Sequence, residues 1–222
     1  MAAHHVFITG GTGYIGRALV PALLARGHHV RTLVRPGSER KLVAGAICIL
    51  GDALTASTYR DAIAPADTFV HLVGTPHPAP WKARQFRAID LASIRAAVEA
   101  ATHARMHHFI YLSVAQPAPI MAAYIAVRRE GEALLQRSGL PTTVLRPWYV
   151  LGPGHYWPLA VAPLYRVLER LPLTRDMALR LGLVHLAELI AALVHAVEHP
   201  PTHIRTIEVP EMRTHRSAAR AA

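Results

Sequence analysis

The sequence predicts an α/β fold, in which helices cover a doubly wound parallel β-sheet. A glycine-rich turn stands directly behind a short apolar run, "VFITGGTGYIG" at residues 6–16. Further along the chain, β-rich runs alternate with long helical runs. The chain has 222 residues, 52% of them hydrophobic, which suits one compact domain with at most a small appended lobe.

The glycine-rich turn lies inside a βαβ unit. "HHVFIT" predicts a buried strand, and the apolar residues of "YIGRALVPALLARGHHV" recur at helical intervals up to Gly27, a residue typical of helix C-termini. Pro21 should kink this helix because it removes a backbone hydrogen bond. "HVRTLVR" then completes the unit. In such a unit, glycines like Gly10, Gly13 and Gly16 allow the backbone to approach a pyrophosphate that binds at the helix N-terminus. The alternative is a glycine-rich turn with a purely structural role.

The alternation continues through most of the chain. Strands are expected at "AICIL", "TFVHLVG", "HHFIYLSV" and "PTTVLRPWYVL", with crossover helices over residues 83–104 and 121–139. We expect a single domain over residues 1–212. Elements of a small substrate lobe are placed at about residues 153–200, and residues 213–222 are expected to form a basic tail.

Composition narrows the function classes. The formal net charge is +10, but the arginines are scattered, so phosphorylated or acidic ligands are favoured over nucleic acid. Histidine pairs without a third ligand nearby predict no metal site. The single cysteine, Cys48, and a first strand close to Met1 predict a cytoplasmic protein. Residues 181–197 predict a packed amphipathic helix rather than a membrane span. A peripheral membrane contact and a homodimer stay open.

Three proline-rich loops follow predicted strands: "GTPHPAPWKA", "AQPAPIMAA" and "GPGHYWPLAVAP". Open α/β sheets bind ligands at the carboxyl ends of their strands, where these loops begin. The three tryptophans, Trp81, Trp148 and Trp157, lie in or beside these regions. The loops are therefore predicted to shape an apolar substrate pocket, and rigid connectors are the alternative.

The chain resembles the short-chain dehydrogenase/reductase superfamily in its extended and atypical NAD(P)-binding branches. The resemblance rests on the order and spacing of "TGGTGYIG", "LVR", "GD", "HLVG", "YLS", a tyrosine with a basic residue four positions on, and "RPWYVLGPG". It implies a Rossmann-type fold with the three glycines under the pyrophosphate, Asp52 near the adenine and Gly74 near the inner ribose. The cofactor-binding positions carried over by the resemblance are Gly10, Thr12, Gly13, Tyr14, Ile15, Gly16, Arg35, Asp52, Ala53, Leu72, Val73, Gly74, Pro147, Tyr149 and Val150.

The end of the second predicted strand bears on the choice of cofactor. A site that prefers NAD needs an acid there to bind the ribose hydroxyls, but this strand ends in Arg35, with Arg40 and Lys41 close behind. A guanidinium can hold a 2′-phosphate by charge-assisted hydrogen bonds, so NADP(H) is predicted over NAD(H). An arginine that simply faces solvent is the alternative.

The resemblance also implies catalytic residues: a tyrosine that moves the proton, a serine that orients the substrate oxygen, and a lysine four residues after the tyrosine. The matching residues are Tyr124, Ser113 and Arg128, with arginine in the lysine position. A spacing of four puts Tyr124 and Arg128 on one helix face, where a cation favours the phenolate. Arginine does not readily release a proton, which weakens the case for a relay through it. A half-buried tyrosine beside a solvated arginine is the structural alternative, and Glu130 and Glu132 are expected to form surface ion pairs.

Together these features predict an NADP(H)-dependent oxidoreductase of the atypical short-chain type, acting on a small, apolar carbonyl, quinone or related substrate. Two alternatives stay open. One is a non-catalytic NAD(P)H-binding sensor or structural subunit. The other is a nucleotide-sugar epimerase or dehydratase, which usually has a larger C-terminal lobe than this chain can supply.

Overall fold

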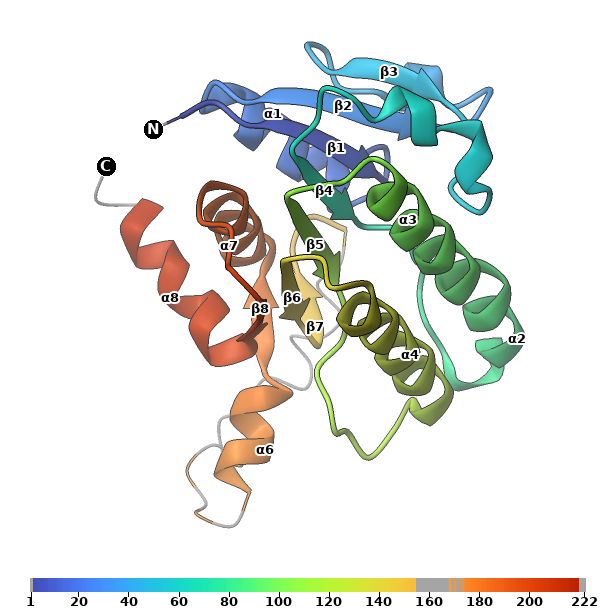
Figure 1. The fold of residues 1–222 in the computed structure, drawn as a ribbon. Helices are drawn as coiled ribbons and strands as arrows, with labels where there is room; N and C mark the ends of the chain where they lie inside the picture. The colour runs from blue at the N-terminus through green and yellow to red at the C-terminus, as the bar shows by residue number, and fades with distance from the viewer. Residues whose placement is uncertain (1, 155–167, 169, 171, 173, 220–222) are drawn as a thin grey trace.

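The computed structural model describes residues 2–154, 168, 170, 172 and 174–219, and its central layer is a parallel β-sheet (Figure 1). Within the described residues the sheet has seven strands, in the order β3 (Ile47–Leu50), β2 (His29–Val34), β1 (His5–Thr9), β4 (Thr68–His71), β5 (His108–Leu112), β6 (Thr142–Arg146) and β9 (Ile204–Glu208). The strand order reverses between β1 and β4, which is the topological switch point of a doubly wound sheet. The predicted fold class is confirmed.

Helices cover both faces of this sheet (Figure 1). One face carries α2 (Ala83–Gln85), the π-helical turn η5 (Phe86–Leu91), α3 (Ala92–His103) and α4 (Ala122–Ser138). The other face carries α1 (Gly16–Ala25), α7 (Leu186–Glu198) and α8 (Val209–Ala219). A small second sheet pairs β7 (Tyr149–Leu151) with β8 (Leu183–His185), and α6 (Arg175–Arg180) precedes it. Short 3-10 turns are η1 (Glu39–Lys41), η2 (Ala56–Thr58), η3 (Arg60–Ala62) and η4 (Pro80–Lys82).

The two cores follow from the alternation of side chains along each strand. In β1, Val6 and Ile8 point to the face that packs against α1 and α7. Phe7 points to the opposite face, where Phe69 lies 5.2 Å from it between ring centroids and Phe109 stacks on Phe69 at 5.0 Å. Because the central strands are buried on both sides, apolar side chains occupy both of their faces instead of alternating with exposed polar ones.

The first helix ends where the sequence predicts. Gly27 has a φ of +81°, its N–H donates to the oxygen of Leu24, and the N–H of His28 donates to the oxygen of Leu23. These two bonds form a Schellman motif. Pro21 lies inside α1 on its exposed side, and the helix runs through it without interruption.

Three segments differ from expectation. The predicted strand at 141–151 divides into β6 and β7, which belong to different sheets, because proline at 147 cannot donate to a ladder. The helix expected over 181–197 begins only at Leu186, after β8. β9, which lies beyond the residues predicted for the substrate lobe, pairs with β6 in the main sheet. The α8 helix continues through residues 213–219, where a basic tail was expected.

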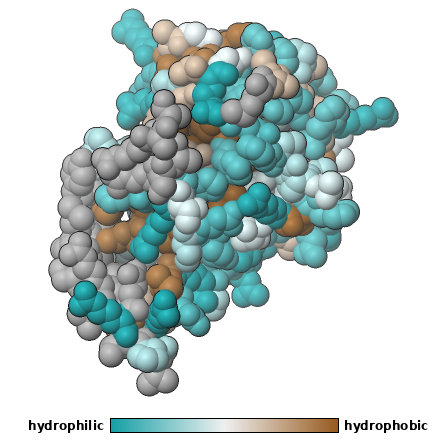
Figure 2. Space-filling model, turned by 90° about the vertical axis from the view of Figure 1, so that its left-hand side faces the viewer, coloured by the Kyte–Doolittle hydropathy of each residue, from teal (hydrophilic) through white to brown (hydrophobic). Residues whose placement is uncertain are grey.

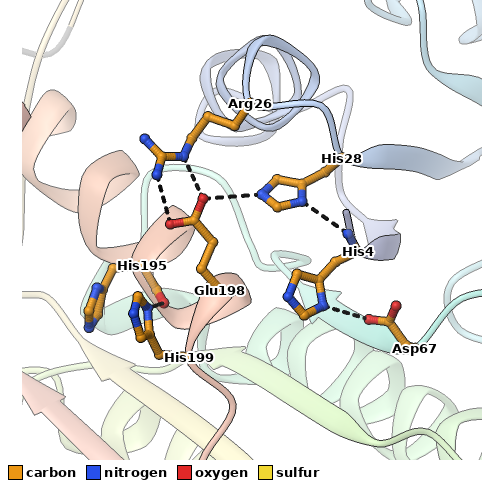
Figure 3. Close-up of polar contacts among 7 residues, drawn as sticks. All are labelled: His4, Arg26, His28, Asp67, His195, Glu198 and His199. Carbon is orange, nitrogen blue, oxygen red and sulfur yellow. Dashed lines mark hydrogen bonds and ion pairs between the residues drawn. The ribbon is translucent and has the colours of Figure 1, made fainter. Parts of the chain in front are cut away.

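Hydrogen bonds and ion pairs connect helices and strands at the amino ends of the strands (Figure 3). This edge of the sheet is opposite the edge that carries the glycine turn. Glu198, at the end of α7, accepts hydrogen bonds from Arg26 at 2.5 and 2.9 Å and lies 3.3 Å from the ring of His28. The backbone N–H of His4 donates to His28, and the ring of His4 lies 3.3 Å from the carboxylate of Asp67. These contacts tie α7 to α1 and β1.

The face shown in Figure 2 is mainly hydrophilic, with hydrophobic residues gathered in separate patches. In the part of the chain that the structure describes, no helix is long and apolar enough to cross a membrane.

Candidate functional site

The glycine turn connects the end of β1 to the start of α1. Gly10 has a φ of +81°, which favours glycine, and a Cβ there would lie 2.9 Å from the carbonyl carbon of Leu72. A Cβ on Gly16 would collide with the oxygen of Gly10 and the backbone of Gly11. The turn is therefore packed tightly against its own helix and against the end of β4.

Gly13 differs from the other two glycines of the turn because a side chain there would meet few atoms of the protein. It is exposed, and the one atom within 4 Å of a Cβ built on it is the oxygen of Gly10, at 3.2 Å. The N-terminus of α1 begins beside it, where unpaired N–H groups and the helix dipole favour an anion. The turn therefore has the room and the polarity that a dinucleotide pyrophosphate requires.

The other predicted cofactor positions lie along the same edge of the sheet. Arg35 directly follows β2 and is exposed, and Asp52 follows β3. The carboxylate of Asp52 accepts hydrogen bonds from the N–H of Leu54 at 3.0 Å and from Thr55 Oγ1 at 3.5 Å, so it also orders its own turn. Residues 72–74 follow β4, and residues 147–150 follow β6. The topology thus gathers segments from five different strands at one edge.

Tyr124 and Arg128 lie one turn apart on α4, as predicted. The Arg128 Cζ atom is 5.1 Å from the centroid of the half-buried Tyr124 ring, which also packs against Phe86 at 4.9 Å between centroids. The solvated arginine of the structural alternative is not found, since Arg128 is only 4% exposed. Its guanidinium lies so close to Gly74 that a Cβ there would collide with it.

Asp90, which the sequence reasoning missed, is the partner of Arg128. Its carboxylate is fully buried and accepts a hydrogen bond from Arg128 Nη2 at 2.7 Å. The other carboxylate oxygen accepts from the N–H of Thr75 at 3.0 Å and from the Thr75 hydroxyl at 2.6 Å. Arg128 Nη1 donates to the carbonyl oxygen of Leu112 at 3.1 Å. The guanidinium is therefore held between η5, the end of β5 and the loop after β4.

A signal for Asp90 existed in the sequence. Asp90 stands four residues from both Phe86 and Ile94, on the stripe that buries its apolar neighbours in the helical run 83–104. An acid in that position needs a buried partner. The π-helical turn that contains Asp90 is a feature often found near functional sites, but nothing in the sequence predicts it.

Ser113 follows β5, as predicted, and its hydroxyl is already engaged. It is 4% exposed and donates to Glu132 Oε1 at 2.5 Å. Glu132 also receives Arg146 Nη2 at 2.6 Å, and Arg146 Nη1 donates to Glu208 at 3.0 Å. Glu132 does form the expected ion pair, but with its side chain 16% exposed it lies below the surface rather than on it.

Burial and the charge of Arg128 control protonation around the site. His71, at the end of β4, is fully buried, and burial together with the nearby Arg128 charge lowers its pKa to about 3. Its ring nitrogens lie 2.8 Å from Thr9 Oγ1 and 3.3 Å from Ser93 Oγ. Burial raises the pKa of Tyr111 to about 12, although the Arg128 charge opposes the rise. Both groups are therefore neutral at physiological pH.

The tryptophans are arranged differently from one another. Trp81 is 83% exposed and does not line an enclosed cavity. Trp148 is half-buried between β6 and β7, with its ring 5.7 Å from that of Tyr149. Trp157 lies outside the described residues, as do most residues of the third proline-rich loop.

The switch point, the glycine turn and the exposed Gly13 define a dinucleotide-binding domain of the Rossmann type. A family model described as NAD(P)H-binding matches residues 10–154. The chain belongs to this NAD(P)H-binding family.

Similar proteins include two reductases. A ceramide reductase of Caulobacter vibrioides is 29% identical over 194 residues, which cover 85% of this chain and 59% of that protein. The 4-hydroxy-2-methyl-3-oxo-4-farnesyl-3,4-dihydroquinoline-1-oxide ketoreductase of Stigmatella aurantiaca is 29% identical over 168 residues, covering 66% of this chain and 50% of that protein. The chain thus spans between half and three-fifths of the length of these relatives.

The fold is also that of solved enzymes. The Bordetella bronchiseptica enzyme WbmH, solved in complex with NAD+, superposes with a TM-score of 0.69 at 18% identity, covering 98% of this chain and 81% of that one. At this identity the likeness shows the fold alone. It confirms the Rossmann-type architecture that the motifs predict.

Proposed function

We propose that this chain is an NADP(H)-dependent oxidoreductase acting on a small, apolar carbonyl, quinone or related substrate. The observation that carries the proposal is the pairing of Tyr124 with a fixed cation: the ring lies 5.1 Å from the Arg128 guanidinium, at the edge of the sheet where the glycine turn opens. The reductase names of the relatives agree with this reaction type.

The cofactor would be held by the turn at Gly10, Gly13 and Gly16, with Asp52 toward the adenine and Gly74 toward the inner ribose. Bound there, it supplies or accepts the hydride. Arg35 is exposed directly after β2, and that strand contains no aspartate or glutamate that would repel a 2′-phosphate. The Arg35 guanidinium can therefore pair with the 2′-phosphate.

Tyr124 is the proposed proton-transfer residue. Its hydroxyl gives a proton to the substrate oxygen during reduction, and the charge of Arg128 stabilises the phenolate that remains. Arg128 is a fixed charge in this scheme rather than a proton carrier, since it stays protonated in its buried pair with Asp90. The Ser113 hydroxyl donates to Glu132, so its lone pairs are left to accept a hydrogen bond. It would have to turn away from Glu132 to donate to a carbonyl oxygen.

A second candidate is favoured by the same geometry. Because Arg128 and Ser113 are both engaged within the protein, the site also fits a non-catalytic NAD(P)H-binding sensor or subunit. Turnover separates the two. Wild-type protein is assayed with NADPH or NADH against a panel of quinones, aldehydes and enones, and the oxidoreductase proposal expects NADPH-dependent turnover of at least one of them.

Tyr124→Phe tests the assignment of the chemistry. It should lower turnover by about two to four powers of ten while leaving NADPH affinity nearly intact. A variant as fast as wild type would remove Tyr124 from the mechanism. A wild type that binds NADPH but turns over none of the panel would favour the sensor.

A further inference from the structure

Two neighbouring loops expose large apolar side chains at the carboxyl edge of the sheet. The loop after β4 ends in η4, where Trp81 is 83% exposed, and the loop after β5 carries Ile120, which is 52% exposed. β4 and β5 pair in parallel, and both loops leave the sheet at the lower edge in Figure 1. η4 and η5 both pack against α4, so the two loops and the helices that follow them form one continuous surface.

This surface is basic as well as apolar. Residues 72–89 and 113–129 contain no aspartate or glutamate, although the chain has 14 acidic residues. The two segments do contain Lys82, Arg84, Arg87 and Arg129, the last three of them exposed. We call residues 72–89 and 113–129 the basic rim.

The nearest acids on the packed elements are already paired. Glu130 binds Arg95 at 2.5 Å, Glu132 binds Arg146, and Asp90 is buried against Arg128. They therefore do little to offset the charge that the rim presents to solvent.

The loop around Trp81 is held in its exposed position. The ammonium group of Lys82 donates to the carbonyl oxygens of Pro76 and His77, at 2.8 and 2.9 Å, and the prolines at 76, 78 and 80 restrict the backbone. An indole ring held outward beside basic residues is the arrangement that suits the lipid headgroup region, where aromatic side chains collect and anionic lipids attract arginine and lysine.

We propose that the basic rim docks on the surface of an anionic lipid bilayer, so that an apolar substrate enters from the membrane beside Tyr124. The basic residues of the rim complement the negative charge of anionic lipids, and the exposed Trp81 suits the headgroup region of a bilayer. The apolar substrate in this proposal is taken from the proposed oxidoreductase function. Docking on the bilayer does not depend on that function, because it is argued from the basic rim alone.

Sedimentation with vesicles tests the docking. Wild-type protein should partition to vesicles of equal parts phosphatidylcholine and phosphatidylglycerol, and much less to phosphatidylcholine alone. Arg129→Glu should lower the partition coefficient at least fivefold, since each basic residue near an anionic surface contributes about fivefold. Arg84→Glu should do the same, and Trp81→Ala should lower binding even at low salt.

The chain offers matched controls away from the rim. Arg137 is exposed near the C-terminus of α4, eight residues after Arg129, and Leu50 is 55% exposed on the edge strand β3. Arg137→Glu and Leu50→Ala should bind vesicles as wild type does. Equal losses in rim and control variants would show general attraction of a basic chain and overturn the proposal, as would a wild type that does not bind anionic vesicles.

A separate readout distinguishes this proposal from the proposed function. Turnover of a water-soluble quinone with NADPH, measured without vesicles, should be the same in Arg129→Glu and in wild type. Absence of turnover with every substrate of the panel would contradict the oxidoreductase proposal, and vesicle partition would still decide whether the rim docks.

Discussion

Removing the carboxylate of Asp90 should destabilise this protein more than most single substitutions. Asp90→Ala deletes a fully buried carboxylate that accepts three hydrogen bonds, at 2.7, 3.0 and 2.6 Å. It leaves Arg128, only 4% exposed, with the carbonyl oxygens of Leu112 and Val73 as acceptors. Leaving one member of a buried ion pair without its partner costs about 3–5 kcal/mol.

That loss converts to a measurable shift in melting temperature. A chain of this size loses roughly 2–4 °C per kcal/mol, so the melting temperature of Asp90→Ala should fall by about 6–20 °C. Arg95→Ala is the matched control, because Arg95 and Glu130 form an ion pair of similar length, 2.5 Å against 2.7 Å, with side chains 59% and 36% exposed. A surface pair of this kind contributes less than about 1 kcal/mol.

Denaturant unfolding of a double-mutant cycle completes the test. Arg128→Met alone should cost as much as Asp90→Ala, because it leaves the carboxylate unpaired. The double variant should cost clearly less than the sum of the two single variants. If the two losses add, or if Asp90→Ala is no worse than Arg95→Ala, the buried pair does not carry the stability assigned to it.

Three further predictions concern the cofactor and pH. Arg35→Asp should weaken NADPH binding in titration calorimetry by a few kcal/mol, since a charge-assisted contact is replaced by repulsion, and equal affinity in both proteins would remove Arg35 from the site. Gly13→Val should abolish NADPH binding and lower the melting temperature much less than Gly16→Val does, because a Cβ at 13 lies 3.2 Å from one backbone oxygen whereas a Cβ at 16 lies 2.4 Å from backbone atoms of Gly10 and Gly11; similar effects on stability would refute the distinction. His71 and His108 have pKa values lowered by burial to about 3 and about 4, so the unfolded chain binds more protons and the free energy of unfolding should fall by about 2 kcal/mol for each between pH 7 and pH 5. In His71→Gln the fall should be smaller, and an unchanged pH dependence would contradict the neutral buried ring.

The sequence by itself determined the βαβ beginning of the fold. The glycine intervals, the Gly27 cap and the apolar runs are local features, and each is set by backbone sterics or by side-chain periodicity within a few residues. The same holds for the spacing that puts Tyr124 and Arg128 on one face of a helix. These features needed no knowledge of distant contacts.

Only the tertiary structure decided what those residues touch. Asp90 and Arg128 are 38 residues apart, and Ser113 and Glu132 are 19 apart, so their hydrogen bonds form only where the fold brings α4 against η5 and against the end of β5. The position of β9 could not be predicted from the local sequence either. A short strand such as "IRTIE" carries no signal for its neighbour in the sheet, and only the fold shows that it pairs with β6. The sequence could place a cation beside the tyrosine, but the fold decided that the cation is buried, paired and fixed, because burial and charge pairing depend on residues that the chain brings together from afar.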